Sequence, residues 1–96
     1  MAAGDFDGDN GSVANNATVT IRPGSAGVVW AIREIGCSGA WELYSYDGTN
    51  TVKMDSWPSR KTLTNRQLIA TYGDYFYLKN VSGATATYHY KYGVLK

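Results

Sequence analysis

The 96-residue sequence contains few of the residues that build catalytic and metal-binding sites. It has one cysteine, Cys37, one histidine, His89, and two glutamates, Glu34 and Glu42. A single cysteine excludes an intrachain disulfide framework and a thiolate zinc site, so we predict a small buried or half-buried thiol. No G-x-S-x-G turn is present to carry a nucleophilic serine. We therefore expect neither an enzymatic activity nor a cofactor.

Long apolar runs and a surplus of charge are also missing. The formal net charge is +1, whereas proteins that bind nucleic acid through phosphates carry a basic surplus. Arg60, Lys61 and Arg66 form a small basic cluster, which leaves nucleic-acid binding as a minority alternative. No apolar run approaches the ~20 residues of a membrane helix. The first residues lack the charged and apolar regions of a signal peptide. We expect no nucleic-acid partner and no membrane contact.

The N-terminal segment is rich in glycine, asparagine and aspartate. Asp5, Asp7 and Asp9 alternate as the oxygen ligands of a calcium loop do, but the positions that require glycine and glutamate hold asparagine. Residues 1–16 can bury little apolar surface of their own. We therefore predict a solvated, flexible N-terminal arm and no metal site.

From residue 17 onwards, short runs of β-branched and aromatic residues alternate with turn-forming residues. Their spacing of about 8–12 residues is typical of an all-β sandwich or barrel, and no window has the 3.6-residue period of a helix. We predict one antiparallel β-sandwich domain over residues 17–96, and residues 59–66 as a loop. The seven predicted strands cover residues 18–22, 27–35, 40–46, 49–55, 67–71, 74–80 and 84–95.

The dipeptide Asp47-Gly48 predicts the first hairpin, because it suits a tight two-residue turn. This register places Glu42 opposite Lys53. A four-residue loop over residues 47–50 would instead place Glu42 opposite Asp55, and like charges are unfavourable there. We therefore expect the tight turn, with an inward face made of Trp41, Leu43, Val52 and Met54.

A second hairpin is predicted to turn at residues 80–83, with Gly83 in a left-handed position. Its register pairs Leu78 with Ala86 and Tyr75 with His89. It would bring Asp74 close to His89, but no serine completes a catalytic triad. The side chains that this hairpin places on the outside are Tyr75, Tyr77, His89 and Lys91.

The chain has eight tyrosines and three tryptophans. Trp30 and Trp41 fall on predicted inward faces and are expected in the core. The two hairpins place four tyrosines outside instead, where aromatic residues are enriched in protein interfaces and in sugar-binding faces, although strands favour tyrosine in any case. The candidate interface residues are Tyr44, Tyr46, Tyr75 and Tyr77.

Three segments together carry a resemblance to a known class of protein. They are ATVTIRPGSAGVVWAIREIGCSG (17–39), YSYDGTNTVKMD (44–55) and YFYLKNVSGATATYHYKYGVLK (75–96). Their shared elements are a V-W-x-I strand, a Y-D-G-T turn, and a Y-x-x-L-K-N-x-S-G hairpin before the last strand. In these elements the chain resembles the small β-sandwich virion proteins of tailed bacteriophages.

This resemblance implies an accessory structural role, such as capsid decoration (cement), head fibre or tail-associated protein, and it transfers no catalytic residue. We expect a non-enzymatic virion protein that is made in the host cytoplasm, binds and stabilises the capsid surface, and assembles as a homo-oligomer. Its partner would be the major capsid protein or another virion protein. The alternative is a carbohydrate- or receptor-binding module at a phage tail or fibre.

Overall fold

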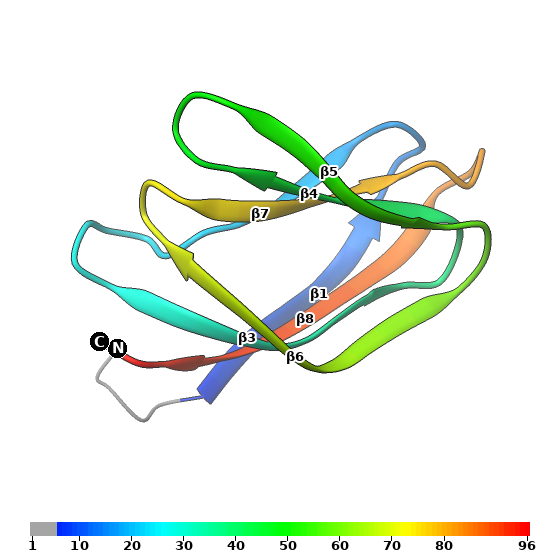
Figure 1. Cartoon of the computed structure of the whole chain (residues 1–96). Helices are drawn as coiled ribbons and strands as arrows, with labels where there is room; N and C mark the ends of the chain where they lie inside the picture. The colour runs from blue at the N-terminus through cyan, green and yellow to red at the C-terminus, as the bar shows by residue number, and fades with distance from the viewer. Residues whose placement is uncertain (1–5) are drawn as a thin grey trace.

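The protein is an all-β, antiparallel sandwich of two four-stranded sheets (Figure 1). The computed structural model describes residues 6–96, and at residues 6 and 65–67 it describes the backbone only. One sheet has the strand order β1-β8-β3-β6 and the other has the order β2-β7-β4-β5. The strands are β1 (Phe6–Val13), β2 (Thr18–Ile21), β3 (Val29–Cys37), β4 (Trp41–Tyr46), β5 (Thr51–Trp57), β6 (Lys61–Thr71), β7 (Tyr75–Asn80) and β8 (Ala86–Val94).

Strand β1 lies within the predicted flexible arm, so the prediction is corrected for residues 6–13. The strand pairs with β8 along its whole length, from Phe6 opposite Gly93 to Val13 opposite Ala86. A side chain at Gly8 would overlap the Tyr90 backbone, so glycine permits the close approach. Residues 7–10 are exposed, and the pairing is made by backbone groups. An apolar pattern could therefore not reveal it. Asp5 lies outside the described residues.

The loop between β4 and β5 has four residues, so the predicted tight turn is wrong. Tyr46 pairs with Thr51 across the loop. The Asp47 carboxylate accepts hydrogen bonds from the backbone N–H groups of Thr49 (3.0 Å) and Asn50 (2.7 Å). This side-chain cap closes the wider loop, which is a known alternative to a two-residue turn for aspartate.

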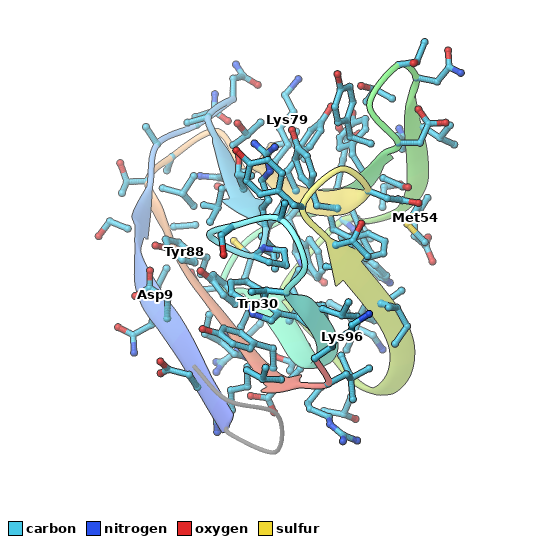
Figure 2. All side chains as sticks on the ribbon, turned by 90° about the vertical axis from the view of Figure 1, so that its left-hand side faces the viewer. Asp9, Trp30, Met54, Lys79, Tyr88 and Lys96 are labelled. Atoms are coloured by element: carbon cyan, nitrogen blue, oxygen red, sulfur yellow. The ribbon has the colours of Figure 1, made fainter. Side chains whose placement is uncertain are left out.

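A β-bulge at Met54 then shifts the register, so that Trp41 pairs with Trp57. Val52 and Met54 lie exposed on β5, the edge strand of its sheet, at 58% and 45%, and are not core residues as predicted; Figure 2 shows Met54 pointing away from the body of the protein. Lys53 precedes the bulge and lies opposite Tyr44, whereas Glu42 lies beyond it, opposite Ser56.

Strands β7 and β8 belong to different sheets, so the second predicted hairpin does not form. β7 pairs with β2 and β4, while β8 pairs with β1 and β3. The chain crosses between the sheets after Asn80, whose side chain is fully buried. Its amide nitrogen donates to the carbonyls of Val13 (2.8 Å) and Ala84 (2.7 Å), and its amide oxygen accepts from Ser82 N–H (2.9 Å). These bonds fix the crossing.

The predicted loop over residues 59–66 is mostly strand, because β5 extends to Trp57 and β6 begins at Lys61. The Trp57 ring packs on Trp41 with the ring centroids 4.4 Å apart. Trp41 is fully buried and its Nε1 donates to the Lys61 carbonyl (3.1 Å). Trp41 therefore contacts both the end of β5, through Trp57, and the start of β6, through Lys61, and these contacts hold the two strands in the sheets.

The core lies between the two sheets, and both predicted inward tryptophans are buried there. Trp30 stacks on Tyr92 with ring centroids 3.7 Å apart. Cys37 is buried and free, as predicted. The remaining fully buried aliphatic side chains include Ile21, Ile32, Ile35 and Leu78.

Replacing Trp41 should cost much more stability than replacing Tyr44, which lies on the opposite face of the same strand. Trp41→Ala removes a buried indole and leaves a cavity, so we expect a loss of about 3–5 kcal/mol in the free energy of unfolding. Tyr44→Ala changes a half-buried side chain and should cost much less. Urea denaturation of both variants measures the difference, and equal losses would contradict the assignment of faces.

Removing the Asn80 amide should also destabilise the sandwich. Asn80→Ala leaves the Val13 carbonyl without its Asn80 donor, and an unsatisfied buried group costs about 1–3 kcal/mol. The Ala84 carbonyl keeps the Ser82 hydroxyl as a donor (2.9 Å). Asn15→Ala is the matched control, because Asn15 accepts one exposed hydrogen bond from Gly83 N–H (2.9 Å) and should cost about 1 kcal/mol or less. A chemical denaturation curve for Asn80→Ala that overlays the control would refute this role.

Candidate functional site

The four candidate tyrosines lie together on the outer face of the sheet β2-β7-β4-β5. Strands β4 and β7 are neighbours, with Tyr44 directly opposite Tyr77 and Tyr46 directly opposite Tyr75. All four are half-buried and alternate with inward-facing core residues, namely Leu43, Phe76 and Leu78. The structure thus brings the predicted residues into one patch, although the hairpin used to place two of them does not exist.

Two of the tyrosines stand upright as a stacked pair. The Tyr44 and Tyr77 rings are 4.9 Å apart between centroids and 13° from parallel. Two parallel rings with centroids this close cannot lie in one plane, because their edges would overlap. The rings therefore stack face to face with a lateral offset. Tyr46 and Tyr75 are 5.3 Å apart and tilted by 54°. The patch therefore presents ring edges and hydroxyl groups to a partner, not one flat aromatic platform.

Glu42 holds the stacked pair in place through the Tyr44 hydroxyl. That hydroxyl donates to one carboxylate oxygen of Glu42 (2.6 Å), and Lys53 Nζ donates to the other (2.9 Å). These two hydrogen bonds, from Tyr44 first and Lys53 second, lower the pKa of Glu42. The same carboxylate raises the pKa of Tyr44 to about 12, and burial adds to the effect. Glu42 and Lys53 form an ion pair, but they are not directly opposite each other as predicted: Glu42 lies opposite Ser56 and Lys53 lies opposite Tyr44.

A cation lies at each end of the patch. At one end the Arg22 guanidinium lies 3.8 Å from the centroid of the Tyr72 ring and 4.7 Å from that of Tyr75, and its Nε donates to the Tyr72 carbonyl (2.7 Å). At the other end Lys79 lies opposite Glu42 in the sheet. We call this surface the tyrosine face: Tyr44, Tyr46, Tyr75 and Tyr77, flanked by Arg22 and Lys79.

The sequence analysis missed Arg22 and Tyr72. Arg22 is the last residue of the predicted strand 18–22, and its alternation with Ile21 gives an outward direction but no partner. Tyr72 directly follows β6 and carries no such signal. Of the predicted basic cluster, Arg60 lies between β5 and β6, Lys61 begins β6, and the side chain of Arg66 lies outside the described part of the structure.

His89 lies beside Glu34 and not beside Asp74 as predicted. His89 Nε2 is 3.5 Å from Glu34 Oε2, and Lys91 Nζ is 3.9 Å from the same oxygen. His89 on β8 pairs with Gly36 near the end of β3, whereas Asp74 lies in the loop after β6, bonded to Thr71, which pairs with Val29 at the start of β3. The predicted approach of Asp74 to His89 assumed the second hairpin, and it fails with that hairpin.

The remaining acidic residues form no ligand cluster in the described chain. Asp7 and Asp9 each accept a hydrogen bond from the backbone N–H of the next residue, at 2.8 Å in both cases. Within residues 6–96, no group of three or more histidine, cysteine, aspartate or glutamate residues is arranged to hold a metal ion. The same part of the chain has no helix that could cross a membrane.

No protein-family model and no curated protein sequence matches the chain. The resemblance to phage virion proteins therefore stays a prediction from the sequence. The geometry of the two sheet surfaces carries the functional argument.

The Glu42–Tyr44 contact predicts an unusual tyrosine titration. Because folding raises the pKa of Tyr44 from 10.0 to about 12, this contact stabilises the fold below pH 10 and loses its effect as the pH rises through about 12. Glu42→Gln removes the carboxylate and should move the Tyr44 pKa back towards 10. Carbon-13 NMR of the tyrosine ring measures this, with Tyr44→Phe to assign the resonance. An unchanged pKa in Glu42→Gln would contradict the contact.

Proposed function

We propose that this protein is a non-enzymatic structural protein of a tailed-phage virion that binds the capsid surface through its tyrosine face and stabilises the capsid. The observation that supports the proposal is the gathering of Tyr44, Tyr46, Tyr75 and Tyr77 on one outer sheet face. Contiguous aromatic surface of this kind marks interaction sites. Tyrosine and arginine are also the residues enriched where protein partners meet.

The detailed geometry favours a protein partner for this face. The Tyr44–Tyr77 stack covers the inner faces of both rings, which leaves less flat surface for a sugar ring to lie on. The upright rings offer hydroxyl groups and edges that fit between protein side chains. Arg22 and Lys79 put positive charge at both ends, which favours a partner surface that carries carboxylates.

The virion assignment rests on the resemblance and on where its motifs fall. V-W-x-I lies in β3, Y-D-G-T forms the end of β4 and the following loop, and L-K-N-x-S-G contains Asn80 at the sheet crossing. Each motif therefore belongs to an element that builds the rigid sandwich. A small rigid domain with one binding face suits a repeating capsid lattice. Many copies would bind equivalent positions of that lattice, and these copies would form a homo-oligomer.

A double variant in the tyrosine face tests the proposal. Tyr44→Ala/Tyr77→Ala should stay folded by circular dichroism but lose binding to purified phage heads in co-sedimentation. Central interface aromatics cost about 2 kcal/mol or more on truncation, which is roughly a 30-fold loss in affinity.

Thr87→Ala is the matched control, because Thr87 is exposed on β8 in the other sheet. It should bind heads as the wild type does. If the wild-type protein fails to sediment with heads, or if the folded double variant sediments normally, the proposed function is wrong.

A further inference from the structure

Two strands, β1 and β5, each form an outer edge of a sheet (Figure 1). β1 pairs with β8 only, and β5 pairs with β4 only. In Figure 2 the two edges lie on opposite sides of the view, where Asp9 marks β1 and Met54 marks β5. An edge strand has backbone N–H and C=O groups that no neighbouring strand uses, so it is a template for another chain. A second copy of the protein could therefore add a strand at either edge.

Both edges are open to such an approach. Residues 7–10 of β1 and residues 51–56 of β5 are exposed. On β1, Gly8 has no side chain to hold another strand away. On β5, the exposed Val52 and Met54 offer apolar surface to an incoming strand. Exposed edges of this kind promote association unless some feature of the strand prevents it.

On β1, two aspartates occupy the backbone donors of the open edge. The Asp7 carboxylate accepts a hydrogen bond from the N–H of Gly8, and the Asp9 carboxylate accepts one from the N–H of Asn10, both at 2.8 Å. Alternate residues of a strand direct their N–H groups to the same side. Gly8 and Asn10 are two positions apart, and both donate to a side chain of their own strand. Their N–H groups therefore face away from β8, towards the open edge.

The same arrangement recurs on β5. The Asp55 carboxylate accepts a hydrogen bond from the N–H of Ser56 at 2.8 Å. The bulge at Met54 is a second obstacle on this strand, because it interrupts the regular spacing of the edge. A contact between an aspartate and the next backbone N–H thus occurs on an edge strand of each sheet.

We propose that Asp7, Asp9 and Asp55 are edge caps, which prevent a second copy of the chain from adding a strand to β1 or β5. Each carboxylate lies where an incoming strand would place a carbonyl oxygen. A hydrogen bond to a carboxylate is roughly twice as strong as one between neutral groups, so a carbonyl does not readily replace it. The inference goes beyond the proposed function, because it concerns the sheet edges and not the tyrosine face.

The test compares alanine with asparagine at the two caps of β1. Asp7→Ala/Asp9→Ala removes both acceptors, whereas Asp7→Asn/Asp9→Asn removes the same charges and keeps an amide oxygen that accepts hydrogen bonds. Loss of two carboxylates makes a chain of formal net charge +1 more positive, which by itself opposes association. Circular dichroism checks the fold of both variants, and intact-mass spectrometry checks that the asparagines are preserved.

Light scattering after size-exclusion chromatography then gives the particle mass over one concentration series. We expect the alanine variant to form dimers or larger assemblies of the wild-type particle, and the asparagine variant to keep the wild-type mass. Asp55→Ala and Asp55→Asn repeat the comparison on β5, with the same expected difference.

Amide hydrogen exchange, followed by NMR in dilute samples, measures the caps directly. After correction for the intrinsic rates of the new side chains, the N–H groups of Gly8 and Asn10 should exchange several-fold faster in the alanine variant. In the asparagine variant they should exchange at the wild-type rate.

Three results would overturn the proposal. The first is a wild-type mass for the folded alanine variants of both edges at every concentration. The second is equal association of the alanine and asparagine variants, which would assign the effect to charge. The third is unchanged exchange at Gly8 and Asn10 in the alanine variant. Tyr44→Ala/Tyr77→Ala keeps all three caps, so its binding to heads tests the proposed function separately.

Discussion

The buried amide of Asn80 is the interaction on which the arrangement of both surfaces depends. It joins the end of β1, at Val13, to the segment that leaves β7, and so fixes the point where the chain changes sheets. Because of this crossing, β7 enters one sheet beside β4 and β8 enters the other beside β1. The tyrosine face and the outer face of the sheet that contains β8 consequently lie on opposite sides of one small sandwich.

The sequence predicts the features that depend on the local alternation of apolar and polar residues. It does not predict the features that depend on contacts between residues far apart in the chain. The all-β class, the positions of most strands and the burial of Trp30, Trp41 and Cys37 follow from residue type and period. The sheet to which β8 belongs does not follow, because Asn80 bonds to a carbonyl 67 positions away in the chain. Strand β1 has no apolar pattern, since it pairs through its backbone and a glycine contact.

The four tyrosines of the candidate site were predictable because local alternation also sets the direction of their side chains. Tyr75 and Tyr77 alternate with the core residues Phe76 and Leu78, so their outward direction holds whichever strand lies beside them. Arg22 joins the tyrosine face through its contacts with the Tyr72 and Tyr75 rings, which only the three-dimensional structure brings together. The bulge in β3 at Arg33 is also missed, because bulges leave no clear trace in residue alternation. Sequence reasoning therefore found the aromatic patch but not its charged end.

The central claim is that one sheet attaches the protein and the other remains open. Hydroxyl-radical footprinting of the free and the head-bound protein, read by mass spectrometry, measures this directly, because tyrosine rings are oxidised where solvent reaches them. The account predicts that oxidation of Tyr44, Tyr46, Tyr75 and Tyr77 falls on attachment, while oxidation of the His89 ring, on the outer face of the other sheet beside Glu34, is unchanged. Protection of His89 with the tyrosine face still reactive would contradict it.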